Sequence, residues 1–315
     1  MNPFTMEKLK VVSVNISETK GTVKKPAGTI RLTHQGVEND AHSGPWNRQI
    51  SILGMESIRK FEKQAGRTIS PGEFAENITL EGFDYARVRP LDRFTCGEVE
   101  IEITQIGKEC HGTSCAIFKE VGDCVMPKEG IFARVLHPGQ ISAGDILEFH
   151  PKMYRALVVT LSDRASSGEY EDRSGARLQE MLRGFFNENG LNLFVHYALI
   201  PDDQYKLTEL VHQSKDELID LLITTGGTGI GPRDFTVDVI KPLLDKEIPG
   251  IMEMIRMKYG ALKTQALISR SVAGVMGKTL VFTLPGSVKA VNEYMEEILK
   301  SLLHLQYMLH GLDVH

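Results

Sequence analysis

Residues 221–236, LLITTGGTGIGPRDFT, decide the fold of the second half of this chain. The first residues are apolar or β-branched, as is typical of a buried strand, and two glycines follow directly. Glycine lets a backbone approach a ligand closely, and threonine hydroxyls add hydrogen-bonding capacity. The stretch therefore predicts a buried strand that ends in a ligand-binding loop.

The same alternation of strand and helix extends on both sides of this stretch. Apolar runs predict strands at residues 155–161, 193–200, 220–225 and 279–284. Helices are predicted at residues 172–189, 204–214, about 236–246 and about 249–263, and a long amphipathic helix closes the chain. In the first of them Leu178, Met181, Leu182 and Phe185 share one face, and Gly190 ends it. This series predicts an α/β domain with a mostly parallel sheet covered on both faces.

The first 150 residues have a different pattern. Short β-branched runs at residues 10–17, 48–53, 99–106 and 145–150 are separated by turns rich in glycine and proline, and one helix is expected at residues 55–66. This predicts a β-barrel with a small helical insertion. Pro151 interrupts any ladder or helix, so we expect two domains, residues 1–151 and 152–315.

Composition excludes several classes of protein. The formal net charge of −5 argues against a nucleic-acid binder that relies on phosphate contacts. No apolar stretch is long enough to span a membrane, and the first residues lack the apolar core of a signal peptide. The four cysteines show no paired CxxC spacing. We therefore expect a cytoplasmic protein with no nucleic-acid or membrane partner.

Three loops follow predicted parallel strands: LSDRASSGEYEDRSG at 161–175, TTGGTG at 224–229 and LPGSV at 284–288. The carboxyl ends of parallel strands meet at one edge of a sheet, where ligands bind. Exposed backbone N–H groups at helix starts bind anions, and Ser162, Thr224, Thr225, Thr228 and Ser287 add hydroxyls. The loops predict a phosphate site, although they match neither a Walker A nor a GxGxxG motif.

Carboxylates are available at the same edge. Asp202 and Asp203 end a predicted strand, Asp234 follows the glycine-rich loop, and Asp238 lies one helical turn further on. They could hold a divalent metal beside a phosphate. They could also cap helices, and one of the tandem aspartates could cap while the other takes part in chemistry.

Six segments carry a family resemblance: LSDRASSGEYEDRSG, LIPDD, ITTGGTGIGPRDFT, PGIMEMIR, LISRSVAGVMG and LPGS. In order and spacing they resemble the molybdopterin adenylyltransferase family, which includes Mog-type proteins and the gephyrin G domain. The resemblance covers residues 155–315. It implies that molybdopterin and ATP bind at the strand ends with Mg²⁺, that adenylyl-molybdopterin and pyrophosphate are formed, and that the protein is a homotrimer.

The resemblance also assigns residues. It implies that Asp202 and Asp234 are catalytic and hold the metal. The implied cofactor-binding residues are Ser162, Asp163, Thr225, Gly226, Gly227, Thr228, Gly229, Glu253, Arg256, Ser269, Arg270, Pro285, Gly286 and Ser287.

Three segments of the first half, GTIRLTHQGVENDAHSGPWNRQISIL, SPGEFAENITLEGF and ITQIGKECHG, resemble the MOSC domain of molybdenum cofactor sulfurases. The resemblance implies that Cys110 carries sulfur or contacts the cofactor, and Lys108 and His111 could lower the pKa of its thiol. An anionic pterin phosphate could be received by Arg31, Arg48, Asn39, Asp40 and His42. A buried, inert thiol is the alternative, and we expect it for Cys96, Cys115 and Cys124.

Two classes of function remain open. The leading interpretation is an enzyme that adenylylates molybdopterin, with a MOSC domain that binds or sulfur-modifies the molybdenum cofactor. It would need a sulfur donor or a molybdate-insertion protein as partner. The alternative is a non-catalytic protein that binds, stores or delivers molybdopterin or the cofactor. Asp202 and Asp234 favour the enzyme, because a simple binder gains nothing from carboxylates beside phosphates. A MOSC reductase module is a weaker third interpretation, because electron-transfer motifs are missing.

Overall fold

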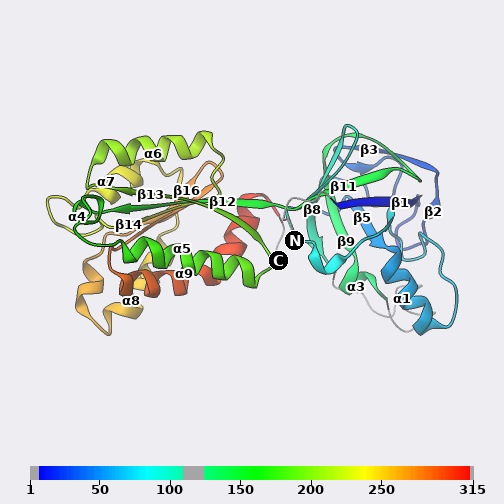
Figure 1. Cartoon of the computed structure of the whole chain (residues 1–315). Coiled ribbons are helices and arrows are strands. Elements are labelled where there is room, and N and C mark those ends of the chain that lie inside the picture. Colours follow the sequence, from blue (N-terminus) through cyan, green and yellow to red (C-terminus); the bar gives the residue numbers. More distant parts are fainter. Residues whose placement is uncertain (1–6, 109–123, 313–315) are drawn as a thin grey trace. The chain divides into compact units, whose positions relative to one another are not determined.

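The computed structural model describes residues 7–108 and 124–312. The chain divides into two compact units, and the division falls between Lys152 and Met153 (Figure 1). In the described residues we find no helix with the length and apolar character needed to cross a membrane.

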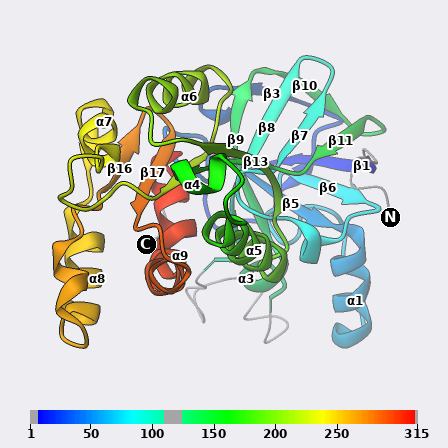
Figure 2. The same cartoon turned by 60° about the vertical axis from the view of Figure 1, so that its left-hand side comes forward.

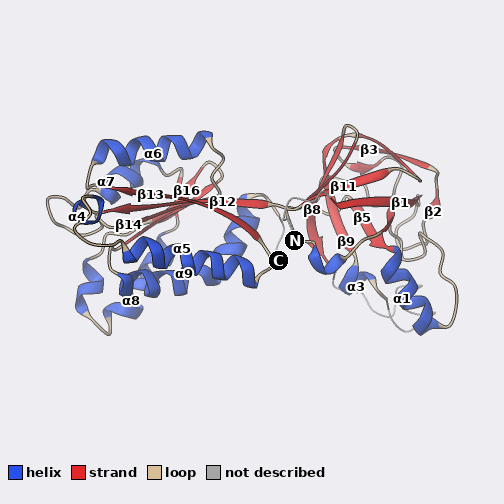
Figure 3. Ribbon diagram, viewed as in Figure 1, coloured by secondary structure: helices blue, strands red, loops and turns tan. Residues whose placement is uncertain are grey.

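The first unit is a β-barrel (Figure 3). Seven of its described strands pair in the order β11-β7-β8-β9-β5-β6-β1, and pairing of β1 with β11 closes the ring. These strands are β1 (Glu7–Ile16), β5 (Ile50–Gly54), β6 (Ile78–Glu81), β7 (Arg93–Cys96), β8 (Val99–Ile106), β9 (Ile131–His137) and β11 (Ile146–His150). The short β2 (Lys25–Pro26) adds to β1. A closed ring leaves no long strand edge free, so the barrel does not need a second sheet to cover an edge.

Alternation along the strands fills the barrel with apolar side chains. In β8, for example, Val99, Ile101 and Ile103 are buried and belong to one core cluster with Phe94 and Phe149. A second, smaller sheet has the order β10-β3-β4 and is made of β3 (Thr29–Thr33), β4 (Gly36–Val37) and β10 (Gly139–Ser142). The predicted barrel is confirmed, and its interior is a packed core.

Short helices lie beside the barrel. They are α1 (Met55–Ala65), α3 (Met126–Glu129) and the 3₁₀ turn η1 (Tyr85–Arg87). The predicted helix after residue 55 is present, and it ends at Gly66 in the left-handed conformation, with φ of 67°. Its buried Ile58 and Phe61 pack in a separate apolar cluster with Met126 and Phe132.

The second unit is built on a six-stranded sheet of order β13-β12-β14-β17-β16-β15. Its strands are β12 (Met153–Leu161), β13 (Asn192–Ile200), β14 (Leu221–Thr225), β15 (Lys246–Glu247), β16 (Ala273–Met276) and β17 (Thr279–Leu284). The strands β13, β12, β14 and β17 are parallel to one another. Strand β16 pairs antiparallel with β17, and β15 pairs antiparallel with β16. The predicted α/β fold with a mostly parallel sheet is confirmed.

Helices cover both faces of this sheet, with α6 and α7 on one face and α5 and α9 on the other (Figures 1 and 2). The helices of the unit are α4 (Asp163–Ser166), α5 (Arg173–Glu188), α6 (Gln204–Asp216), α7 (Thr236–Ile240), α8 (Pro249–Gly260) and α9 (Val288–Leu309), with 3₁₀ turns η3 (Lys241–Leu243) and η4 (Thr264–Ile268). Successive residues of β12 serve opposite faces. Leu157 and Val159 belong to the apolar cluster that includes Leu207 of α6. The Tyr154 ring packs edge to face against Phe186 of α5.

Two details of the prediction are wrong. The helix expected at about residues 236–246 stops at Ile240 and continues only as a 3₁₀ turn, because Pro242 has no N–H to donate. In α5 the buried phenylalanine is Phe186, which is 1% exposed, whereas Phe185 is only partly buried. The site is unaffected, because both differences lie away from the strand ends.

Candidate functional site

The carboxyl ends of the four parallel strands lie at one level. In the sheet register Leu161 is opposite Ile200, Thr160 opposite Thr225, and Thr225 opposite Leu284. The next residues along the chain are Ser162, Pro201, Gly226 and Pro285. The sequence motifs that follow separate strands are therefore brought together at one sheet edge, with α4 lying there (Figure 2).

The glycine-rich loop passes close to its neighbours. Gly226 and Gly227 have φ of 105° and 64°, the left-handed region that favours glycine. A Cβ on Gly226 would clash with the carbonyl oxygen of Leu161, and one on Gly227 would clash with the Thr236 hydroxyl. A Cβ on Gly286 would lie 3.3 Å from the Cα of Gly226. Side chains are excluded here for steric reasons, because the loop packs against Leu161 and Thr236. Gly226 is buried and its N–H donates to the Leu284 carbonyl at 2.9 Å, whereas Gly227 is partly exposed.

The serines at this edge begin helices. Ser162 caps α4 by accepting from the N–H of Ala165 at 3.3 Å, and Ser287 caps α9 by accepting from the N–H of Ala290 at 3.2 Å. Thr225 and Thr228 are 0% and 4% exposed, and the Thr225 hydroxyl donates to the Pro285 carbonyl at 3.0 Å. The structure therefore does not bring the Thr225 side chain to a surface that a ligand would reach.

The tandem aspartates have separate tasks. Asp203 caps α6, since its carboxylate accepts from the N–H groups of Tyr205 and Lys206 at 2.9 and 3.2 Å. Asp202 makes no such cap. Its own N–H donates to Oδ1 of Asp163 at 2.9 Å. The Asp202 carboxylate is therefore the one that remains for chemistry.

Asp202 and Asp234 influence each other electrostatically. Burial raises the pKa of Asp202, and the negative charge of Asp234 raises it further. Asp234 is fixed at the loop by the N–H of Gly231, which donates to its Oδ2 at 2.8 Å. A Cβ on Gly229 would lie 2.6 Å from the same oxygen. The fold thus holds two carboxylates close enough to repel, beside the glycine-rich loop.

Arg233, which the sequence analysis did not single out, lies against this acidic group. Its Nη2 contacts Oδ2 of Asp163 and lies 3.5 Å from Oδ2 of Asp202. Sequence spacing could not indicate this contact, because the three residues come from separate loops.

Arg256 and Arg270, two arginines of the predicted set, make hydrogen bonds within the protein. Arg270 donates to the Gly229 carbonyl at 2.7 Å and, through both terminal nitrogens, to Asp238 at 2.8 and 2.9 Å. Arg256 donates to the Ser271 and Ser269 carbonyls at 3.0 and 3.4 Å. Arg270 therefore positions the glycine-rich loop, and Arg256 connects α8 to the segment that leads into β16. Glu253 is exposed on α8.

The carboxylates of Asp202 and Asp234 suit a hard divalent cation. Asp202 and Asp234 supply two oxygen ligands, and Mg²⁺ is commonly held by one or two carboxylates together with substrate phosphates and water. Burial and the charge of Asp234 raise the pKa of Asp202, and a cation beside the two carboxylates would offset this effect. Among the residues that the structure describes, no group of three His, Cys, Asp or Glu side chains is arranged to hold a metal.

The predicted thiol site lies largely outside the described residues, which exclude Cys110, His111 and Cys115. Cys124 is 8% exposed. Cys96 is partly buried at the end of β7, and burial raises the pKa of its thiol. For Cys96 and Cys124 this agrees with the expected buried thiol.

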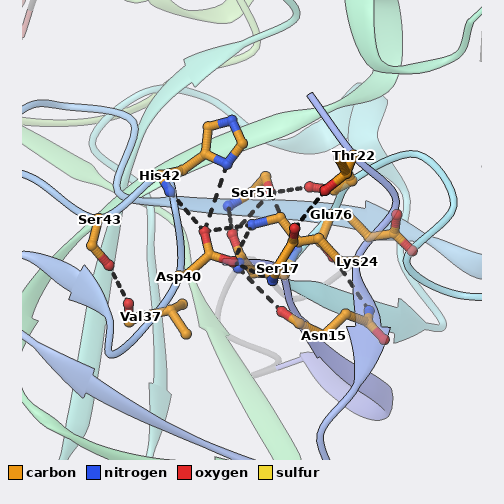
Figure 4. Close-up of polar contacts among 12 residues, drawn as sticks. Asn15, Ser17, Thr22, Lys24, Val37, Asp40, His42, Ser43, Ser51 and Glu76 are labelled. Atoms are coloured by element: carbon orange, nitrogen blue, oxygen red, sulfur yellow. Dashed lines mark hydrogen bonds and ion pairs between the residues drawn. The ribbon is translucent and has the colours of Figure 1, made fainter. Parts of the chain in front are cut away.

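Of the other polar residues predicted near that site, Asp40 belongs to a buried ion pair and His42 lies beside it (Figure 4). Both oxygens of Asp40 accept from Lys24 Nζ at 2.6 Å, and both side chains are 0% exposed. Nδ1 of His42 lies 3.6 Å from Asp40, and its side chain is 38% exposed. Burial opposes ionisation of Asp40, but bonds from His42 and Lys24 hold its pKa below the ordinary range. Asp40 therefore lies in the interior behind His42, whereas Arg31 and Arg48 are exposed.

A second buried acid, Glu76, accompanies this pair. Its Oε1 accepts from the N–H of Gly72 at 2.5 Å and from the Thr79 hydroxyl at 2.8 Å, while Oε2 has no hydrogen-bond partner among the residues that the structure describes. Burial raises the pKa of Glu76. Nothing in the sequence pattern indicated that Lys24 and Glu76 are interior residues.

Comparisons with known proteins agree with this division. The family model described as "Probable molybdopterin binding domain" matches residues 157–304, and the MOSC domain model matches residues 39–148. The chain is 38% identical over 163 residues to molybdenum cofactor biosynthesis protein B of Staphylococcus carnosus, and the match spans 50% of this chain and 90% of that protein. It is 33% identical over 165 residues to a molybdenum cofactor biosynthesis bifunctional protein of Chlorobaculum tepidum, across 52% of this chain and 50% of that one.

A solved structure is also similar to the second unit. It is the crystal structure of the molybdopterin biosynthesis enzyme MoaB from Thermus thermophilus, with 37% identity and a TM-score of 0.46. The match covers 50% of this chain and 98% of that one.

Proposed function

Because this chain belongs to the molybdenum cofactor biosynthesis protein B family, as a fusion of a MOSC domain with a molybdopterin-binding domain, we propose that its second unit adenylylates molybdopterin with Mg-ATP. The observation that carries the proposal is the pair Asp202 and Asp234 beside the glycine-rich loop at Gly226 and Gly227.

The substrates are two phosphates. An oxygen of the terminal phosphate of molybdopterin attacks the α-phosphorus of ATP, a new P–O–P bond forms, the bond between the α- and β-phosphates breaks, and pyrophosphate leaves with the bonding electron pair. Asp202 and Asp234 would hold Mg²⁺, which would neutralise charge on the phosphate oxygens.

The chain's own residues bind and orient the reactants. The part of the loop from Gly227 to Gly229, which is partly exposed at both glycines, accepts a phosphate at close approach. The starts of α4 and α9, at Ser162 and Ser287, border the same edge, and Arg270 fixes the loop in place. Charged phosphates are thereby held in line without a covalent intermediate, and positioning supplies the rate enhancement.

The deciding experiment uses the purified chain with molybdopterin and Mg-ATP. We expect one adenylyl-molybdopterin and one pyrophosphate per turnover, detected by mass spectrometry and a coupled pyrophosphate assay. Tight molybdopterin binding with no adenylylated product would instead establish the non-catalytic storage or delivery function.

For the first unit we propose that the MOSC domain binds or sulfur-modifies the cofactor through Cys110, with sulfur supplied by another protein. The match of the MOSC model to residues 39–148 supports this role. Brief alkylation at neutral pH, read by peptide mass spectrometry, should label Cys110 ahead of Cys96 and Cys124, and bound cofactor should protect it. Equal labelling of the three would contradict the proposal.

We also propose that the second unit forms a homotrimer. Apolar side chains on and after α8, a helix at the outer part of this unit (Figure 2), support an interface between copies. Met257, Leu262 and Leu267 are 75%, 80% and 54% exposed. Light scattering of the purified chain tests the proposal, and a monomeric mass would contradict it.

A further inference from the structure

Arg233 lies over the acidic edge of the second unit. It sits in the loop between β14 and α7, next to Asp234. From there its guanidinium reaches the acids that follow β12 and β13, contacting Asp163 and lying 3.5 Å from Asp202. One side chain thus links three of the loops that form the strand-end site.

The contacts of Arg233 with Asp163 and Asp202 can break and form again. The Arg233 side chain is 63% exposed, so most of it is open to solvent. Asp163 and Asp202 are more enclosed, with 36% and 23% of their side chains exposed. A bond between the Asp202 N–H and Asp163 Oδ1, 2.9 Å long, keeps the two acids together whether or not Arg233 is present. The acids form the fixed part of the site and the guanidinium the movable part.

We propose that Arg233 is a positioning residue that exchanges with the divalent cation: it neutralises Asp163 and Asp202 in the ligand-free protein and withdraws when the metal binds. The proposal rests on the proposed function in one respect, that Asp202 is a metal ligand. A guanidinium and a divalent cation beside the same Asp202 carboxylate repel each other, so the two bind in competition. Arg233 therefore weakens binding of the free metal ion in the absence of substrate.

The test measures Mn²⁺ binding to the full-length protein without nucleotide, by electron paramagnetic resonance. Removal of a partly exposed ion pair is worth about 0.2–1 kcal/mol, so Arg233→Ala should lower the Kd for Mn²⁺ about 1.4- to fivefold. Arg233→Lys keeps the positive charge but loses the planar guanidinium, so its Kd for Mn²⁺ should lie between those of the wild type and Arg233→Ala. The matched control is Arg183→Ala, which removes one positive charge from an exposed position in α5 and should leave the Kd unchanged.

An unchanged or higher Kd in Arg233→Ala would overturn the proposal, as would the absence of Mn²⁺ binding to the wild-type protein. A merely structural Arg233 would lower Tm and weaken Mn²⁺ binding, which is the opposite sign. If Arg233→Ala does not fold, Arg233→Lys carries the same comparison. The outcome is separate from the proposed function: a wild-type chain that binds Mn²⁺ in competition with Arg233 but forms no adenylylated product contradicts the enzyme and leaves the exchange intact.

Discussion

At the scale of single residues, Asp202 and Asp203 are neighbours in the sequence but have different surroundings. Asp203 is a helix cap, and Asp202 faces Asp163, Arg233 and Asp234. Capping needs an acceptor that is close to two N–H groups, and a metal needs a carboxylate whose oxygens are not already bonded to backbone N–H groups. The different surroundings of the two carboxylates make Asp203 a control for Asp202.

The first prediction is that Asp202→Asn and Asp234→Asn each lower kcat for adenylyl transfer at least about 100-fold, because loss of a metal ligand removes several kcal/mol of charge stabilisation. Binding of molybdopterin should change much less. Asp203→Asn should retain activity and stability, because asparagine caps helices as well as aspartate. Steady-state kinetics with product detection compares the three variants, and full activity of either of the first two removes that residue from the mechanism.

Three buried acids in the first unit share an unusual backbone. Asp40, Glu76 and Asp92 are each 6% exposed or less, and each directly follows a non-glycine residue with positive φ: Asn39 at 61°, Ala75 at 62° and Leu91 at 75°. The left-handed conformation costs an L-residue roughly 1–2 kcal/mol. Each turn thus directs the following carboxylate into the interior, and the left-handed backbone conformation costs free energy at that residue.

From this strain we predict that Ala75→Gly leaves stability unchanged or raises it by up to about 1 kcal/mol, since relief of the strain exceeds or equals the added entropy of glycine in the unfolded chain. Ala65→Gly, at a right-handed helical position in α1, should lower stability by about 0.5–1 kcal/mol. Urea unfolding measures the free energy of unfolding of the two variants. A loss in Ala75→Gly as large as that in the control would show that the turn carries no strain.

Asp92 gives the first unit a pH dependence. Its carboxylate accepts from the N–H groups of Lys152 and Arg89, both at 2.7 Å, but burial raises its pKa from 3.8 to about 6. A raised folded-state pKa means that the folded state binds the proton more tightly than the unfolded state. The stabilisation is complete below pH 3.8 and disappears as the pH rises to about 6.

We therefore predict that Asp92→Asn removes a decline in the unfolding free energy of roughly 2–3 kcal/mol between about pH 4 and pH 6, as the shift in pKa requires. Asp84→Asn, at an exposed capping carboxylate, should keep the decline. Denaturant unfolding at closely spaced pH values measures both. The same slope in Asp92→Asn as in the wild type would assign the pH dependence to other groups.

At the scale of the element, the loop after β14 is the part whose shape the sequence constrains most. Gly226 combines a φ of 105° with a backbone neighbour, the Leu161 carbonyl, at the place where a Cβ would lie. Neither constraint can be relieved by rotating a side chain. The loop therefore keeps one conformation relative to β12 and presents its backbone groups in fixed positions.

The corresponding prediction is that Gly226→Ala lowers stability by at least about 1–2 kcal/mol and weakens ATP binding, because the loop must move away from β12. Gly250→Ala is the matched control. Gly250 lies in the first turn of α8, and a Cβ there meets open space, so the variant should be neutral or slightly stabilising. Thermal unfolding and isothermal titration with Mg-ATP make the comparison, and equal behaviour of the two variants would show that the loop tolerates a side chain.

At the scale of the whole molecule, the chain consists of two units with separate cores. The apolar clusters of the barrel and of the six-stranded sheet have no member in common. A unit with its own core and its own closed set of strand pairs has what it needs to fold alone. We therefore treat the two proposed activities as independent.

We predict that a chain of residues 152–315 is soluble and adenylylates molybdopterin with the kcat of the full-length protein. Size-exclusion chromatography and the same product assay test this, with the full-length Asp202→Asn variant as the inactive reference. Aggregation of the shorter chain would show that the units depend on each other for folding.

The sequence by itself determined the architecture of both units and the sheet edge at which the candidate site lies. Runs such as residues 221–225 are apolar or β-branched throughout because a parallel strand is buried on both faces, and the glycines that follow identify the ligand edge. These signals are local, since a strand, its periodicity and its terminating turn are contiguous in the chain. The early end of α7 was also readable from Pro242.

Only the tertiary structure decided which polar groups meet. Lys24 pairs with Asp40, and Arg233 contacts Asp163, because folding brings separate loops together. It also decided that Asp203 rather than Asp202 caps α6. No periodic pattern specifies such contacts, since a single charged residue in a loop has the same local sequence whether it ends up buried, paired or exposed. Burial and pairing depend on distances between segments that the sequence separates, and those distances exist only in the folded chain.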